Sequence, residues 1–194
     1  MENKLPQRKH PRLKEYDYSA AGAYFVTICT HRRRCILSRV VGRGLAPAET
    51  ELTALGVIAR EQLTALTERF PSVEITDYVI MPNHIHILLT LKEAAGASPR
   101  PTVSSVIGAY KSLTTRLAKQ VCPLEKLFQT SFHDHVIRSE DDLRTVREYI
   151  AHNPVRWQED ELYSETFNIK KAPLRVLFLI LQTKCRPDDP ERIG

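Results

Sequence analysis

Apolar residues recur along the chain with two periods, one typical of strands and the other typical of helices. Runs rich in β-branched and aromatic residues predict four strands, over 23–30, 72–80, 84–91 and 132–138. Apolar positions at helical spacing predict three helices, over 51–69, from 103 to about 120, and from Ser139 to about Asn153. Residues 38–50, which contain glycine and proline, are predicted to form a loop.

These elements follow one another as strand, helix, two strands, helix, strand and helix. Only Met81, Pro82 and Asn83 separate the second strand from the third, which indicates an antiparallel hairpin. The order is typical of an α+β fold, the ferredoxin-like sandwich, in which helices cover one face of an antiparallel sheet. We therefore expect the other face of the sheet to be open.

Length and composition indicate one soluble globular domain, since the chain has 194 residues, 42% of them hydrophobic and 26% charged. We expect a basic arm over 1–18, a folded domain over 19–158 and a tail of unknown role over 159–194. The apolar stretch 176–181 is far shorter than the roughly 20 residues that cross a bilayer, so no membrane partner is expected. The polar N-terminus and four cysteines without CxxC spacing favour a reduced cytoplasmic protein.

Basic residues outnumber acidic ones by 28 to 23, and the excess is clustered. Such clusters favour polyanionic partners, although a solvated basic surface would have the same composition. The candidate phosphate contacts are Arg8, Lys9, Arg12, Arg32, Arg33, Arg34, Lys111, Arg116 and Arg138.

The third predicted strand contains two histidines in an otherwise mostly apolar run. Residues two apart in a strand point to the same face, so His84 and His86 lie side by side while Ile85 and Ile87 face the helices. Two imidazoles on the open face would form half of a site for a divalent ion. The alternative is a pair of ordinary surface histidines.

A second pair, His133 and His135, flanks Asp134 in the fourth predicted strand. If these histidines faced the open side, Asp134 would face the core, which is unfavourable for a carboxylate. We therefore expect Phe132 and Asp134 to face the open side and both histidines to be partly packed, with contact to the metal site as the alternative.

The last predicted helix offers a phenol and a carboxamide one turn apart, from Tyr149 and Asn153. The carboxamide oxygen of Asn153 suits a hard ion such as Mg²⁺ or Mn²⁺ beside two imidazoles. Tyr149 would then attack a phosphodiester, because a phenol is both a usable nucleophile and a good leaving group. Tyr110 is the rival nucleophile, but its spacing places it on a core-facing stripe.

Four segments together, "YFVTICTHRRR", "MPNHIHILL", "FHDHVIR" and "YIAHNPVRW", resemble the REP-associated tyrosine transposases of the HUH single-strand nuclease superfamily. The resemblance covers roughly residues 10 to 158. It implies that His84, His86 and Asn153 bind the metal and that Tyr149 is the nucleophile. It also implies cleavage and strand transfer of hairpin-bearing single-stranded DNA through a 5′-phosphotyrosine intermediate.

We thus expect a metal-dependent enzyme whose partner is single-stranded DNA with REP-like hairpins, in the cytoplasm and associated with the nucleoid. A monomer is slightly favoured over a homodimer. The alternative from another class is a noncatalytic hairpin-binding protein of the same fold. A replication initiator is less favoured, since the chain has neither a helicase region nor a recognisable pair of catalytic tyrosines.

Overall fold

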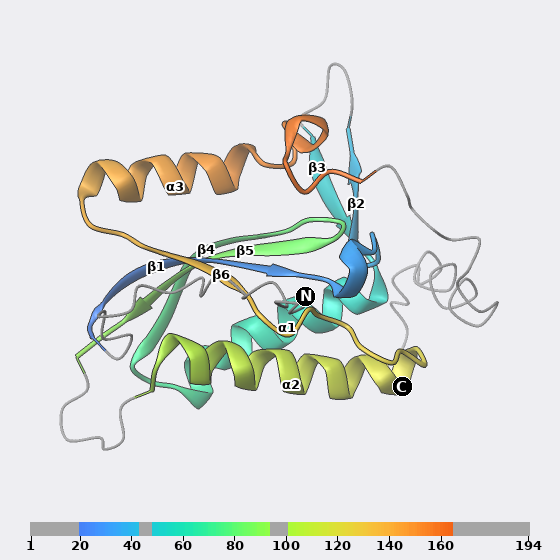
Figure 1. Cartoon of the computed structure of the whole chain (residues 1–194), viewed down its shortest axis with the longest axis horizontal. Coiled ribbons are helices and arrows are strands. Elements are labelled where there is room, and N and C mark those ends of the chain that lie inside the picture. The colour runs from blue at the N-terminus through green and yellow to red at the C-terminus, as the bar shows by residue number, and fades with distance from the viewer. Residues whose placement is uncertain (1–19, 43–47, 94–100, 165–194) are drawn as a thin grey trace, which may run out of the picture.

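The computed structural model describes residues 20–42, 48–93 and 101–164. At its centre is a four-stranded sheet in which every neighbouring pair is antiparallel (Figure 1). Its order is β4 (Val73–Ile80), β5 (His84–Leu91), β1 (Gly22–Cys29) and β6 (His133–Val136). The predicted hairpin of β4 and β5 is confirmed.

The helices cover both faces of this sheet. Helices α1 (Ala54–Arg69) and α2 (Val103–Val121) lie on one face, whereas α3 (Glu140–His152) lies on the other, above the sheet in Figure 1. The α+β class is therefore confirmed, but the expectation that all helices share one face and leave the other open is wrong for α3. The apolar residues of α3 are buried by packing on this second face of the sheet.

Each layer has its own apolar core. Between the sheet and the helices α1 and α2, buried side chains of β1 and β5 pack against Leu63 and Tyr110. Between the sheet and α3, a smaller cluster includes Val146 and Ile150 of α3, Leu88 of β5, and Trp157. The second core covers the face that bears His84 and His86.

Helix α3 begins at the predicted cap, because the Oγ atom of Ser139 accepts a hydrogen bond of 3.1 Å from the backbone N–H of Asp142. Two side-chain contacts attach the helix to the sheet. His135 of β6 lies 2.9 Å from the Asp142 carboxylate, and Arg147 donates to Asp77 of β4 at 3.1 Å. The helix thus runs along the sheet from the end near β6 toward His84.

The segment predicted as a loop contains a further pair of strands, β2 (Ser38–Val41) and β3 (Glu49–Leu52), which form a separate antiparallel ribbon. The predicted helix start at residue 51 is also wrong, because residues 49–52 form β3 and α1 begins after Thr53. Thr53 caps α1 by accepting from Gly56 N–H. Two short 3-10 turns complete the described chain, η1 (His31–Arg33) and η2 (Trp157–Glu159).

The register of β6 reverses the predicted orientation of its side chains. His133 and His135 pair with Thr27 and Phe25, so both lie on the face that bears His86, while Asp134 pairs with Val26 on the α2 side. Phe132 belongs to the core between the sheet and α1 and α2. Side chains two residues apart in a strand share a face. Burial of Phe132 in this core therefore places Asp134 on the same side of the sheet.

The predicted arm over 1–18 and most of the predicted tail, 165–194, lie outside the described residues. Within the described ranges, none of the helices combines the length and apolar character that a membrane span requires.

Candidate metal and nucleophile site

His84 and His86 occupy neighbouring outward positions of β5, as the alternation predicted, and α3 with the segment after it covers them. His84 is fully buried and His86 is 2% exposed, with their ring centroids 4.4 Å apart. Burial lowers the pKa of each imidazole to about 3, opposed at His84 by the nearby Asn153 side chain. Both rings are therefore neutral, the form that binds metals.

A hydrogen bond to each Nδ1 atom sets the orientation of each ring. Nδ1 of His84 lies 2.8 Å from Oδ1 of Asn83, whose amide group donates to Leu162 O at 2.7 Å. Since the Asn83 oxygen only accepts, Nδ1 of His84 bears the proton and Nε2 has a free lone pair. Nδ1 of His86 lies 2.9 Å from Oγ1 of Thr27 on β1.

The two Nε2 atoms and Oδ1 of Asn153 are buried and have no hydrogen-bond partner in the structure. Buried polar atoms are nearly always satisfied, so these three acceptors suit a bound cation as their partner. The donor set, two imidazoles and a carboxamide oxygen, fits a divalent ion.

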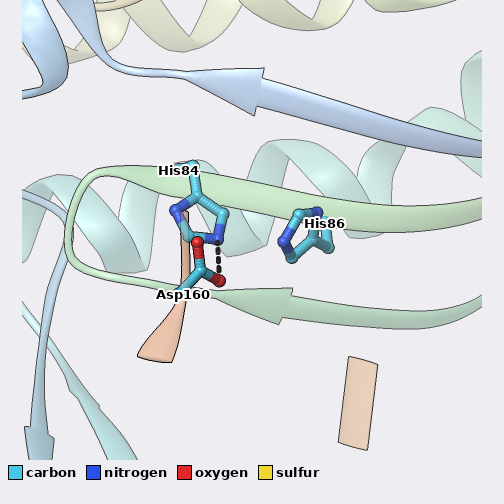
Figure 2. Close-up of side chains that lie close together, drawn as sticks. All are labelled: His84, His86 and Asp160. Carbon is cyan, nitrogen blue, oxygen red and sulfur yellow. Dashed lines mark ion pairs between the residues drawn. The ribbon is translucent and has the colours of Figure 1, made fainter. Parts of the chain in front are cut away.

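Asp160 joins this cluster, although sequence analysis assigned it to the tail. It follows η2, and Figure 2 shows its carboxylate facing His84, with Oδ2 3.9 Å from His84 Nε2. One ligand atom from each of His84, His86 and Asp160 lies within 4.8 Å of the others. Metal–ligand bonds of about 2.1 Å place opposite ligands roughly 4 Å apart, so a small contraction would close this group around an ion.

Asn153 ends α3 as its C-cap residue and is 2% exposed. Its amide nitrogen donates to Oδ2 of Asp160 at 2.9 Å, which directs the carboxamide into the cluster. The backbone N–H of Leu162 donates to Oδ1 of Asp160 at 2.6 Å. The end of α3 and the following turn are thus connected through one carboxylate.

Tyr149 lies beside this group, one turn before Asn153. Its ring centroid is 5.2 Å from that of His86, and its hydroxyl donates a long hydrogen bond of 3.4 Å to Oδ2 of Asp160. Burial and the negative charge of Asp160 raise the pKa of Tyr149 to about 12. The side chain is nevertheless 42% exposed, so a substrate can reach the phenol.

Residues 19–153 match the family model described as "Transposase IS200 like". The chain belongs to the IS200-like transposase family. The matched range includes His84, His86, Tyr149 and Asn153 but ends before Asp160. The function of this family member is therefore transposase-like.

Two further comparisons found a relative in sequence and a relative in fold. An uncharacterized protein of Haemophilus influenzae is 28% identical over 175 residues, which cover 82% of this chain and 94% of that protein. A REP-associated tyrosine transposase, whose structure was solved bound to a REP hairpin, is similar in fold with a TM-score of 0.54. It is 24% identical, and the match covers 75% of this chain and 74% of that one.

In this IS200-like transposase the rival nucleophile Tyr110 lies far from the histidine cluster, as its spacing predicted. It is fully buried on α2, under the opposite face of the sheet, and its hydroxyl donates to Ala59 O at 3.1 Å. Burial raises the pKa of Tyr110 well above its ordinary value. It has the environment of a core residue.

The basic residues after β1 occupy two environments. Arg32 and Arg33 are exposed and adopt left-handed backbone conformations, with φ of 58° and 51°. The charge of Arg33 contributes to the lowered pKa of His84, after the larger effect of burial. Arg34 instead donates to Lys126 O at 2.8 Å and His31 O at 3.2 Å, which is a structural role.

The other candidates for DNA contacts that the structure describes lie away from the histidine cluster. Lys111 and Arg116 lie on α2, on the other side of the sheet. Arg138 precedes α3, whose 13 residues place it about 20 Å from Asn153 at the far end of the helix. Arg8, Lys9 and Arg12 lie outside the described residues.

Proposed function

We propose that this protein is a metal-dependent single-strand DNA endonuclease and strand transferase that acts on hairpin-bearing DNA. The observation that supports it most directly is the group of three unsatisfied buried acceptors on His84, His86 and Asn153, beside the reachable phenol of Tyr149. Family membership supports the DNA substrate. The REP hairpin bound by the structural relative supports the hairpin.

In this proposal His84, His86 and Asp160 hold a Mg²⁺ or Mn²⁺ ion, with Oδ1 of Asn153 as a further ligand. The ion would neutralise charge on the scissile phosphate and orient it for in-line displacement. Asp160 adds a negative charge to two neutral imidazoles, which shifts the preference of the site toward hard divalent ions. Nδ1 contacts from Asn83 and Thr27 hold both rings with Nε2 toward the ion.

Tyr149 supplies the nucleophile. Its Oη atom attacks phosphorus while the bond from phosphorus to the 3′ oxygen breaks, which leaves a 5′-phosphotyrosine and a free 3′-hydroxyl. The phenol proton leaves to solvent, which reaches the partly exposed Tyr149 side chain, and the 3′ oxygen takes up a proton from solvent. The reverse step, with a new 3′-hydroxyl as the attacking group, completes strand transfer.

A covalent adduct tests this proposal. The protein is incubated with a pool of single-stranded oligonucleotides that contain hairpins with randomised flanks, in Mg²⁺ or Mn²⁺, and separated on a denaturing gel. We expect an adduct that is absent in Tyr149→Phe and in His84→Ala. Tyr78→Phe is the matched control, because Tyr78 on β4 is 41% exposed, close to the 42% of Tyr149.

The noncatalytic alternative makes a different prediction in the same assay. Hairpin binding without any adduct, in either metal, would support a binding protein of this fold and contradict the nuclease. An adduct that persists in Tyr149→Phe and is lost in Tyr110→Phe would contradict the assignment of the nucleophile.

A further inference from the structure

A hollow of about 470 Å³ lies between α2 and the segment that leads from α2 to β6. Four cationic side chains line it: Lys111, Arg116 and Lys119 from α2, and Lys126 from the segment. Helix α2, which forms one wall of the hollow, lies on the side of the sheet opposite to α3, the helix that bears Tyr149 (Figure 1). The hollow is therefore distinct from the histidine cluster.

Two of these cations converge on one residue. The Nζ atom of Lys111 donates to Thr130 O at 2.8 Å, and the Nζ atom of Lys126 donates to Thr130 Oγ1 at 2.7 Å. Burial and the charge of Lys126 lower the pKa of Lys111 to about 8. Two ammonium groups held this close repel each other, and the repulsion would be relieved by an anion bound between them.

Nothing within the described residues neutralises the hollow. No carboxylate of the described ranges lies within ion-pair distance of Lys111, Arg116, Lys119 or Lys126. The side chains of Arg116 and Lys119 are exposed, so their donors remain available. Most of the other lining side chains are neutral and polar, including Ser112, which suits phosphate oxygens better than an apolar ligand.

The wall of the hollow is anchored to the end of β1 that lies beside the histidine cluster. The backbone N–H of Gln129 donates to Cys29 O at 2.9 Å, and Cys29 pairs with His84 in the sheet. Adjacent strands are about 4.8 Å apart, so only about 10 Å of backbone separates the hollow from the metal-site strand. Arg32 and Arg33 lie on η1, whose His31 N–H donates to Leu127 O of the same segment at 2.8 Å.

We propose that this hollow binds the phosphodiester backbone of single-stranded DNA, as a second contact for the strand whose scissile phosphate lies at Tyr149. Arg32 and Arg33 would continue the basic path from one site to the other. The inference takes its DNA substrate from the proposed function, but it concerns binding and is testable without cleavage.

The test measures the affinity for fluorescein-labelled oligothymidylate by anisotropy, in EDTA, with Tyr149→Phe as the parent so that no adduct forms. The double variant Arg116→Gln/Lys119→Gln removes two cations of the hollow. Arg60→Gln/Arg69→Gln is the matched control, because it removes two exposed cations from α1 with the same change in net charge.

We expect the hollow variant to bind about tenfold more weakly, and the slope of log affinity against log salt to fall by about 1.4, since each lost phosphate contact on a single strand contributes about 0.7. The control should change affinity by less than about twofold. Equal losses in both variants, or no loss in the hollow variant, would overturn the inference. A loss confined to duplex DNA would overturn the assignment to a single strand.

The adduct assay tests the nuclease and the binding assay tests the hollow, so either proposal can be contradicted while the other stands. If Tyr149 forms no adduct but the hollow variant still loses affinity, the DNA contact stands and the nuclease does not. If wild-type protein forms the adduct and the hollow variant of the parent binds like the parent, the nuclease stands and the hollow does not bind the strand.

Discussion

Asn153 donates a hydrogen bond of 2.9 Å to Oδ2 of Asp160, and the same oxygen accepts the hydroxyl of Tyr149 at 3.4 Å. One carboxylate, seven residues after Asn153, thus joins the proposed nucleophile to the proposed carboxamide ligand. It also lies 3.9 Å from Nε2 of His84. The four residues form one group, so a change at Asp160 should alter both metal binding and the position of the phenol.

Asp160→Asn should weaken Mn²⁺ binding by at least about tenfold, because it replaces a charged ligand with a neutral one of the same shape. Trp157 is the single tryptophan of the chain, and its ring centroid is 5.9 Å from that of His84, so its fluorescence should report the titration. Glu159→Gln is the control, since Glu159 is the exposed neighbour of Asp160. Equal affinity in Asp160→Asn and in this control would remove Asp160 from the ligand set.

Thr27→Val should reduce metal affinity by about tenfold without removing any ligand, because the His86 ring loses the hydrogen bond at Nδ1 that orients it. The two side chains have nearly the same volume, so the packing should be retained. Calorimetric titration with Mn²⁺ measures the affinity. Thr67→Val on the exposed surface of α1 is the control, and unchanged binding in Thr27→Val would contradict the orienting role.

DNA affinity should fall as the pH rises from 7 to 9, in a way that depends on Lys111. The pKa of Lys111 is lowered to about 8, so its charge is lost within this range and not near 10.5. A lysine binds phosphate only when protonated, hence affinity falls with rising pH. Two other groups, Lys126 and Cys29, act on the charge of Lys111. A negative charge on Cys29 would favour protonated Lys111, but burial raises the pKa of this thiol, so the fall in affinity with rising pH should remain.

The measurement is anisotropy with oligothymidylate at constant ionic strength, compared between the parent and Lys111→Gln. The variant should bind more weakly at pH 7 and show a flatter profile. A profile of the same steepness in both proteins would assign the pH dependence to another group.

Two glycine substitutions should have opposite effects on stability. A Cβ atom at Gly56 would lie 2.0 Å from the backbone oxygen of Leu37, so Gly56→Ala should destabilise the fold by about 2 kcal/mol or more.

A Cβ atom at Gly108 of α2 meets no atom within 4 Å, so Gly108→Ala should stabilise the fold by about 0.5–1 kcal/mol. Urea denaturation measures both, and destabilisation by Gly108→Ala would contradict the open space around that position.

Local signals were strong where a segment has a clear period of apolar positions or a recognisable cap. The strand β5 matches its predicted range, and α3 begins after the predicted Ser139 cap. Helix α2 was predicted to within about one residue. Such elements are specified by their own periodicity and caps, which is why sequence suffices for them.

The ribbon of β2 and β3 escaped prediction because its strands have four residues each and alternate only weakly between polar and apolar positions. Pairing between the two segments, and the hydrogen bond from Ser38 to Ile80 O, stabilise it. Neither contact is visible in a local pattern. The orientation of β6 was wrong for a related reason, since pairing with β1 decided which face each side chain takes.

The sequence by itself determined the parts of the site that depend on a repeat. The two-residue period of a strand places His84 beside His86, and the helical period places Tyr149 one turn from Asn153. Only the tertiary structure decided that α3 lies over the histidines, and that the chain turns after Trp157 to bring Asp160 to the same point. No periodicity extends through that turn, because its position depends on packing of Trp157 beside His84 and on the Asn153–Asp160 hydrogen bond.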